Sequence, residues 1–312
     1  MAADLGVPSR VLIVRLSAIG DVILASGLIP MLKAAWPGVE IAWLTEEANA
    51  GLLRHNPRLS RLYTLPRGRW AKLWREGRYL AVLGELRDLV RRLRAARFDL
   101  VLDTQGLLKS GVLARASGAR QRIGLGSKEG SRLLMTRVVS RAVTSHLPGK
   151  EYRALGRALG LDERAYRLDV VPGAEDQAAA AALCAESGLT AGFAVFCPFT
   201  TRPQKHWFDE RWIELARLFQ AEFGVPVAWL GGPGDRGHAE ALAAAGGGVC
   251  LAGRTSLAVA AALIGRARLL VGVDTGLTHL GLAMARPTLA LFGSTRPYLE
   301  PDAPRARVLY EP

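Results

Sequence analysis

The sequence is poor in cysteine, and this excludes two classes of protein. Only three of its 312 residues are cysteines, at positions 184, 197 and 250, and no two of them form a Cys-x-x-Cys pair. An odd number of scattered cysteines argues against a disulfide framework and against a zinc site. We therefore expect a protein of a reducing compartment, the cytoplasm.

Long uninterrupted apolar runs are also absent. The N-terminal stretch VLIVRLSAIGDVILASGLIPML is apolar overall, but Arg15 and Asp21 interrupt it. No run reaches the roughly 18 to 20 residues of a membrane-spanning helix, and no small-residue cleavage site follows an unbroken apolar segment. We expect a soluble protein that at most lies on a membrane surface.

Several nucleotide-binding and catalytic signatures are missing as well. The sequence has no Walker A loop, no Gly-x-Gly-x-x-Gly and no Asp-x-Asp pair for a divalent cation, and no Ser-His-Asp or Cys-His pairing is apparent. A bound nucleoside diphosphate would then be held by helix N-termini and basic side chains. We expect no metal and no cofactor.

Basic residues are abundant but unevenly distributed. Residues 1–160 hold 27 Lys and Arg against 12 Asp and Glu, whereas residues 161–312 hold 14 against 16. Within residues 54–97 there are 13 basic and three acidic residues. An arginine-rich composition explains part of this excess, since only six of the basic residues are lysines. The asymmetry between the halves predicts an anionic partner for the first half: nucleic acid, a lipid surface or a phosphorylated substrate.

Apolar β-type runs alternate with helical stretches along the whole chain, which predicts an α/β protein with doubly wound parallel sheets. Strands are expected at 10–16, 39–45, 61–65, 98–104, 121–125, 193–199, 226–232, 267–273 and 287–293. Helices are expected at about 20–36, 79–96, 106–117, 149–159, 175–187, 207–223, 235–245, 256–264 and 277–285. The stretch RLDVVPGAED divides the chain into two Rossmann-like domains, 1–168 and 169–312. Ligands of such sheets bind at the carboxyl ends of the strands, and we expect these edges to face one central cleft.

Two strand ends of the second half are suited to a diphosphate. After ARLLVGV, Asp274, Thr275 and Gly276 begin a helix whose unpaired N–H groups favour an anion, although Asp274 is equally a plain helix cap. After FAVFCPF, a Thr-Thr-x-x-x-Lys loop ends in Lys205, which supplies hydroxyl donors and one positive charge. The turn WLGGPGDRGH contributes a weaker candidate for a ribose hydroxyl, Asp235.

In the first half the stretch RLSAIGDVILA follows the first strand directly. It places a carboxylate, Asp21, at the start of the next helix. This aspartate is either a general base or a charge that stabilises the helix dipole, and the two roles are compatible.

Four stretches together resemble glycosyltransferase family 9. They are RVLIVRLSAIGDVILASGLIPMLKAAWPGVEIAWLTEE, DTQGLLKSG, TTRPQKHW and VGVDTGLTHLGLAMARPTLALFGST, in the family's order and nearly end to end. The resemblance implies a GT-B fold, with an N-terminal acceptor domain and a C-terminal nucleotide-sugar domain. It also implies inverting, metal-independent transfer of heptose from ADP-heptose to a Kdo sugar of the lipid A core. The stretches RGRWAKLW and DTQGLLKSG favour addition of the first heptose over the second.

The resemblance also implies roles for individual residues. Asp21 matches the general base. The positions that match donor contacts are Thr200, Thr201, Lys205, Gly232, Asp235, Thr255, Asp274, Thr275, Gly276 and His279. Two of these depart from the family pattern, because Asp235 replaces a Glu at the ribose and Thr255 replaces a Met near the adenine.

The acceptor is expected on the basic half. The candidates are Ser17, Gly20, Arg67, Arg69, Lys72, Asp103, Gln105 and Lys109. The same basic stretch predicts peripheral contact with the anionic cytoplasmic face of the inner membrane. Its tryptophans, Trp70 and Trp74, lie four residues apart, which fits either a membrane interface or a buried helix face. We expect a monomer whose last residues pack back on the N-terminal domain.

Other functions are compatible with parts of the sequence. A nucleic-acid binder would explain the basic first half but leaves the neutral second half without a role, and no known binding module is present. A second-heptose transferase, a GT-B epimerase and a non-catalytic nucleotide-sugar binder are further alternatives. We rank the glycosyltransferase first and expect no nucleic-acid partner.

Overall fold

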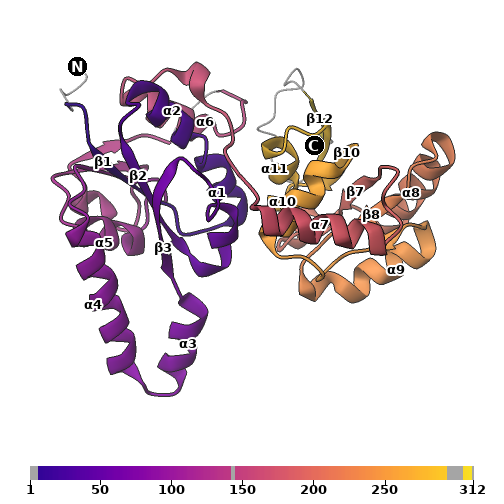
Figure 1. The fold of residues 1–312 in the computed structure, drawn as a ribbon, viewed down its shortest axis with the longest axis horizontal. Coiled ribbons are helices and arrows are strands. Elements are labelled where there is room, and N and C mark those ends of the chain that lie inside the picture. Colours follow the sequence, from indigo (N-terminus) through magenta and orange to yellow (C-terminus); the bar gives the residue numbers. More distant parts are fainter. Residues whose placement is uncertain (1–5, 142–144, 294–304, 311–312) are drawn as a thin grey trace. The chain divides into compact units, whose positions relative to one another are not determined.

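The computed structural model describes residues 6–141, 145–293 and 305–310. The chain forms two compact units, residues 1–144 with 149–169, and residues 145–148 with 170–312. We call them the N-terminal unit and the C-terminal unit (Figure 1). Each is built on its own six-stranded sheet, and every strand pairing in both sheets is parallel.

The N-terminal unit alternates strands and helices. Its strands are β1 (Arg10–Val14), β2 (Glu40–Glu46), β3 (Leu59–Leu65), β4 (Leu100–Asp103), β5 (Gln121–Leu125) and β6 (Arg137–Val139). Its α-helices are α1 (Ile19–Ala25), α2 (Leu28–Ala35), α3 (Arg67–Arg75), α4 (Tyr79–Ala95), α5 (Leu108–Ala116) and α6 (Lys150–Ala158). Short 3-10 helices lie at Glu47–Leu52, Ser131–Leu134 and Glu163–Ala165.

The strand order in this unit is β3-β2-β1-β4-β5-β6. Leu12 and Val14 of β1 pack in one cluster with Leu89 of α4 and Leu113 of α5. Because side chains alternate along a strand, the intervening buried residues of β1 face the opposite side of the sheet, and α2 packs against α6. The sheet is thus covered on both faces, which explains its continuous apolar strands.

The C-terminal unit repeats this plan. Its strands are β7 (Ala194–Cys197), β8 (Val227–Trp229), β9 (Val249–Cys250), β10 (Leu269–Val273), β11 (Thr288–Phe292) and β12 (Ala306–Tyr310). Its α-helices are α7 (Ala174–Glu186), α8 (Asp209–Phe223), α9 (Arg236–Gly246), α10 (Leu257–Arg266) and α11 (Gly276–Ala283). Short 3-10 helices lie at Pro203–Lys205 and Pro233–Asp235.

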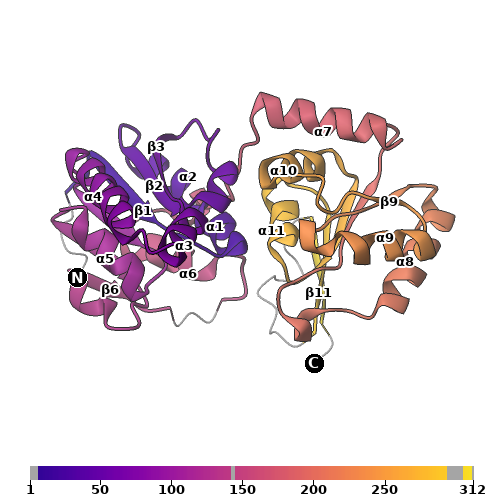
Figure 2. The same ribbon diagram turned by 90° about the horizontal axis from the view of Figure 1, so that it is seen from below.

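Its strand order, β12-β11-β10-β7-β8-β9, is the order of the first sheet when its strands are counted from β7. Phe196 of β7, Trp212 of α8 and Trp229 of β8 form an aromatic centre on one face, with ring centroids 5.5 to 6.4 Å apart. Helices α7 and α10 pack against each other, and Figure 2 shows the unit from a second direction.

The strands expected from the sequence are present, with ends shifted by a few residues. Three short strands were not predicted, β6, β9 and β12, and neither was helix α3. The helix expected at 20–36 is divided into α1 and α2. Residues 306–310, near the C-terminal end that we expected to pack on the N-terminal domain, pair with β11 in the second sheet, and the last two residues lie outside the described part. Within the described residues, no helix combines the length and the apolar character needed to cross a membrane.

Candidate functional site

The first candidate site lies where the strand order of the N-terminal sheet reverses. Strands β1 and β4 are neighbours there, and Val14 is paired with Asp103 at their carboxyl ends. The loops that follow the two strands line a pocket of about 280 Å³. Open α/β sheets bind their ligands at this position. The charged or polar side chains of the pocket are Arg15, Ser17, Asp21, Gln105, Lys128 and Arg141.

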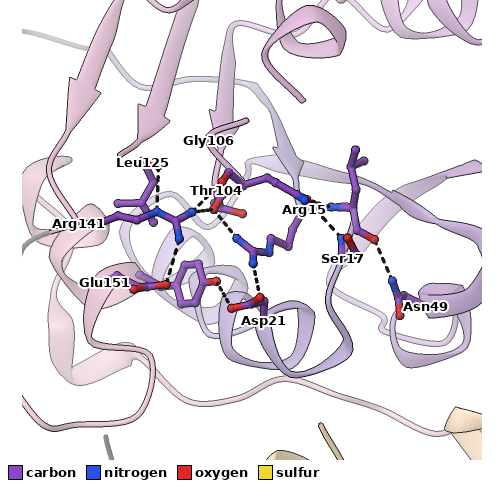
Figure 3. Close-up of polar contacts among 12 residues, drawn as sticks. Arg15, Ser17, Asp21, Asn49, Thr104, Gly106, Leu125, Arg141 and Glu151 are labelled. Carbon is purple, nitrogen blue, oxygen red and sulfur yellow. Dashed lines mark hydrogen bonds and ion pairs between the residues drawn. The ribbon is translucent and has the colours of Figure 1, made fainter. Parts of the chain in front are cut away.

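Asp21 is held by side chains and remains accessible. One carboxylate oxygen forms an ion pair with Nη2 of Arg15, and the hydroxyl of Tyr152 lies 3.5 Å from the other (Figure 3). The side chain of Asp21 is 38% exposed to solvent, whereas that of Arg15 is 6% exposed. The cap position of α1, Ala18, has no side-chain hydrogen bond. Asp21 is therefore an oriented carboxylate at the pocket wall, near enough to the helix start to gain from the dipole as well.

Two buried or half-buried guanidinium groups hold the loop after β4. Nη1 of Arg15 donates to the carbonyl oxygen of Thr104 at 2.7 Å. Nη2 of Arg141 donates to the carbonyl oxygens of Thr104 and Gln105, both at 2.8 Å, and its Nη1 lies 3.6 Å from Glu151 (Figure 3). These hydrogen bonds hold the backbone of the loop after β4 in place. Because backbone oxygens carry no net charge, the positive charges of Arg15 and Arg141 are balanced by Asp21 and Glu151.

Tyr152, on α6, is a buried neighbour of the carboxylate. Burial raises its pKa well above the usual value, and the nearby Arg15 offsets this only in part. The phenol thus stays protonated over the physiological range and acts toward Asp21 as a hydrogen-bond donor.

Asp103 and Gln105, predicted to contact the acceptor, are turned into the protein. Asp103 is fully buried and accepts hydrogen bonds from the backbone N–H groups of Gln105 and Gly106, at 3.1 Å each, and from Oγ of Ser110 at 3.0 Å. Burial raises its pKa despite these bonds. These hydrogen bonds of Asp103 position the loop that follows β4.

The side chain of Gln105 connects the two loops of the pocket. Its Oε1 accepts from the backbone N–H of Leu16 at 2.8 Å and of Ser17 at 3.3 Å. Ser17 lines the pocket, and Gly20 lies next to Asp21 in α1. These two predicted acceptor residues are therefore brought beside the candidate base.

The basic candidates fall into two groups. Arg67 and Lys109 come together at Glu46, whose Oε1 lies 3.4 and 3.5 Å from their nitrogens. Arg69 instead pairs with Glu85 of α4 at 2.6 Å. Lys72 lies 3.9 Å from Glu76 and is exposed. An anionic acceptor near Arg67 and Lys109 would compete with a single carboxylate for two cations.

Sequence reasoning missed several residues of this pocket as functional candidates. Arg15 carried a signal, since a charged residue directly after a buried strand is unusual unless it has a partner. Arg141 and Tyr152 carried none, because only the fold brings Arg141 to the pocket and Tyr152 to Asp21. Lys128 lines the pocket, is exposed and makes no ion pair with the residues that the structure describes.

The second candidate site occupies the equivalent position in the C-terminal sheet, at the carboxyl ends of β7 and β10. Nζ of Lys205 contacts Oδ2 of Asp274 in an ion pair whose side chains are 16% and 10% exposed. The two residues were predicted separately and are 69 positions apart. An arriving diphosphate would find a cation that is already oriented by a carboxylate.

The remaining donor candidates lie in segments that follow strands of the same sheet, at its carboxyl edge. Thr275 caps α11 and precedes Gly276, its first residue. His279 is buried, and Thr278 donates its hydroxyl to the carbonyl oxygen of Val273 at 2.6 Å. In the loop after β7, the carbonyl oxygen of Thr200 lies 2.8 Å from His206, and Thr201 is exposed.

Gly232 and Asp235 form a closed turn after β8, in which the Asp235 carboxylate accepts the N–H of Gly232 at 2.8 Å. Thr255 lies beyond β9, and the backbone N–H of Gly253 in its loop donates to the carbonyl oxygen of Gly231 at 3.1 Å. The loops after β8 and β9 are thus adjacent. Among the described residues, no three His, Cys, Asp or Glu side chains form a potential metal site.

Known proteins resemble this chain in sequence and in fold. Residues 86–309 match the model of glycosyltransferase family 9 (heptosyltransferase). Lipopolysaccharide heptosyltransferase 1 of Pseudomonas aeruginosa is 34% identical over 92% of this chain and 79% of its own length. The Escherichia coli K12 enzyme of the same name is 30% identical over 93% and 89%.

Among solved structures, E. coli heptosyltransferase WaaC with ADP-2-deoxy-2-fluoro heptose superposes with a TM-score of 0.76 at 29% identity, over 97% of this chain and 93% of that one. Two Rossmann-like units with this strand order form the GT-B fold expected from the sequence. The family match covers well over half of the chain and agrees with the fold. The chain therefore belongs to glycosyltransferase family 9 (heptosyltransferase) and is a glycosyltransferase.

Proposed function

We propose that the protein transfers L-glycero-D-manno-heptose from ADP-heptose to Kdo of the lipid A–Kdo acceptor during synthesis of the lipopolysaccharide inner core. The relatives named heptosyltransferase 1 support addition of the first heptose. The solved relative that holds an ADP-heptose analogue supports the donor. The observation that carries the proposal is an oriented, accessible carboxylate, Asp21, in a pocket at the carboxyl edge of the first sheet.

The reaction we propose is a single in-line displacement with inversion. The acceptor hydroxyl oxygen attacks the anomeric carbon of the heptose while Asp21 takes its proton, and the bond to the ADP oxygen breaks. Arg15 and Tyr152 hold the two carboxylate oxygens, so the base is oriented before the acceptor arrives. Both neighbours are buried, which limits the freedom of the carboxylate.

The departing diphosphate needs positive charge, and the C-terminal unit supplies it. Lys205 provides one charge, and the N–H groups at the start of α11, which have no partner within the helix, provide fixed dipoles. We propose that these groups stabilise the leaving ADP without a metal ion. Asp235 would bind the ribose and Thr255 would lie near the adenine.

The acceptor carries phosphates and carboxylates, and the pocket of the N-terminal unit is basic. Lys128 at the pocket, with Arg67 and Lys109 at Glu46, would contact these anions. We further propose a cytoplasmic protein in peripheral contact with the anionic inner membrane, because its acceptor is a membrane lipid. It would act as a monomer without a nucleic-acid partner.

The test is a transfer assay with purified protein, ADP-heptose and Kdo-lipid A, with and without EDTA. Asp21→Asn keeps an oxygen for Arg15 but cannot accept the proton, so we expect the transfer rate to fall about 10²- to 10⁴-fold. The matched control is Asp88→Asn, at an exposed aspartate of α4 that pairs with Arg91. The control and the EDTA sample should react like the untreated wild type.

Other outcomes would change the assignment. Equal turnover of Asp21→Asn and wild type would leave Asp21 as a helix-stabilising charge and require another base. Loss of transfer in EDTA would overturn the metal-free reaction. If the wild type binds ADP by calorimetry but transfers nothing, the non-catalytic nucleotide-sugar binder becomes the better description.

A further inference from the structure

Helices α3 and α4 form a hairpin that extends away from the sheet of the N-terminal unit, with the joining turn at its far end (Figure 1). The turn is ordered by backbone hydrogen bonds, since Gly77 donates to the carbonyl oxygen of Trp74 at 3.1 Å and Arg78 donates to that of Leu73 at 2.9 Å. Gly77 has a positive φ of 72°, which favours glycine at this point. The hairpin therefore presents the side chains near its turn in a defined arrangement.

Four large apolar side chains are exposed beside this turn. Leu80 is 84% exposed, Trp74 59%, Leu83 51% and Tyr79 47%, and we call these four residues the hairpin tip. The rings of Trp74 and Tyr79 are in edge contact, with centroids 4.7 Å apart. Leu83 lies one helical turn after Tyr79 and Leu80 in α4, so we expect the four side chains to form one apolar surface, and exposed apolar surfaces mark interaction sites.

The two tryptophans of α3 have different surroundings. Trp70 packs against the core cluster of the N-terminal unit and donates from Nε1 to Glu85 at 2.7 Å. Trp74 points outward to the hairpin tip. Trp70 and Trp74, four residues apart, thus differ in burial: Trp70 packs on the core and Trp74 is exposed. Of the two, only Trp74 is available to a partner.

The charge around the hairpin tip indicates which partner it fits. Residues 67–97 hold ten basic and three acidic residues. Arg87 and Arg91 follow Leu83 at intervals of four on the same face of α4, so each lies about 6 Å further along the helix. A second copy of this chain would bring two strongly positive surfaces together. An anionic bilayer accepts both features, with the apolar tip at the acyl boundary and the arginines at the phosphates.

We propose that the hairpin tip inserts into the headgroup region of an anionic bilayer and anchors the enzyme there. The inference deepens the proposed function, on which it rests, because an acceptor held by acyl chains presents its sugar at that surface. Amphipathic anchors of this kind penetrate about 5 to 10 Å, which is comparable to the distance from Leu83 to Arg87.

The test compares a hairpin variant, Trp74→Ser with Leu80→Ser, with a control variant, Leu218→Ser with Phe223→Ser. The control removes a leucine and an aromatic residue of similar exposure, 61% and 63%, from α8 of the C-terminal unit. Flotation is measured with vesicles of phosphatidylglycerol and phosphatidylethanolamine, and with phosphatidylcholine vesicles. We expect the hairpin variant to bind the anionic vesicles at least about tenfold more weakly, and the control to bind like the wild type.

Two further readouts separate the explanations. Transfer to a deacylated, water-soluble Kdo acceptor should be the same in both variants and the wild type. If no protein uses that acceptor while flotation still depends on the tip, the proposed function fails and the anchor stands. The anchor is overturned if the hairpin variant floats like the wild type, if the wild type does not bind anionic vesicles, or if sedimentation shows that the tip pairs two copies.

Discussion

Two aspartates at the carboxyl edge of the first sheet differ in what surrounds them. Asp21 is partly exposed and contacts Arg15 and Tyr152, whereas Asp103 is fully buried and bonded to its own loop. Asp103 is the last residue of β4 and Asp21 lies shortly after β1, and both were predicted to function at the site. Burial separates the accessible carboxylate, which we propose as the base, from the one that shapes the loop, and sequence position alone does not report burial.

The buried carboxyl of Asp103 should leave a signature in the pH dependence of stability. Burial raises its pKa above the ordinary 3.8, so the stability it contributes is fully present below that pH and is lost as pH rises through the raised value. Asp103→Asn has no such titration. We expect the free energy of unfolding of the variant, minus that of the wild type, to become more positive between about pH 4 and pH 7.

Urea denaturation of both proteins over this range measures the difference. Asp99→Asn is a useful comparison, because Asp99 also accepts backbone N–H groups, from Ser9 and Arg10, but is exposed. A constant difference for Asp103→Asn across the range would contradict a raised pKa.

At the scale of elements, the first helix shows how a local signal was overlooked. The stretch 20–36 was predicted as one helix, but the structure divides it after Ala25. Pro30 has no N–H to donate, and its ring would collide with the carbonyl group four residues earlier, at Ser26. Pro30 is tolerated in the first turn of α2, where no such bond is required. Pro30 is therefore a local signal for the division, which the prediction of a single helix did not use.

The junction between α1 and α2 also depends on a distant aromatic ring. A Cβ at Gly27 would lie 2.3 Å from the ring of Tyr166, whose hydroxyl donates to the carbonyl oxygen of Leu24 at 2.5 Å. We expect Gly27→Ala to destabilise the N-terminal unit by about 1 to 3 kcal/mol, because ring and helix must move apart. Chemical denaturation followed by circular dichroism measures this loss.

Gly38→Ala is the matched control, since a Cβ at Gly38 would meet no atom within 4 Å. It should change stability far less. A similar loss in both variants would contradict a role for the contact with Tyr166, because the lower entropy of the unfolded chain by itself favours Ala over Gly at such positions.

On the scale of the whole molecule, the chain uses one strand order twice. Each unit has its own hydrophobic core, and each brings its candidate residues to the point where the strand order reverses. At that point the first unit has a carboxylate with a basic pocket, and the second has a lysine with a helix start. Equivalent positions in the two sheets therefore carry different chemistry.

This division predicts where ADP acts. We expect ADP to slow hydrogen exchange chiefly at the carboxyl edge of the second sheet, in the loop 198–206 and in residues 274–279, which include the start of α11. At a hundredfold excess over its Kd, ADP should stabilise this unit by about 2.7 kcal/mol. Exchange followed by mass spectrometry, with and without ADP, measures the protection.

The Lys205→Met variant should lose most of that protection, because it removes the cation at the diphosphate and leaves Asp274 to repel it. Arg211→Met, at an exposed pair with Glu214 on α8, should keep it. Protection confined to the N-terminal unit would contradict the assignment of the donor to the second sheet.

The sequence by itself determined the alternation of strands and helices, the family and the strand ends near which Asp21, Lys205 and Asp274 lie. These features are local, because hydrophobic periodicity and turn residues act over a few positions along the chain. The tertiary structure decided which of these residues meet. Tyr152 reaches Asp21 across 131 positions, and only folding buries Asp103 and exposes the hairpin tip. Long-range packing sets the burial of a side chain and the partners that it contacts. Those two properties separate the proposed base, Asp21, from the buried Asp103, and the exposed hairpin tip from the residues of the core.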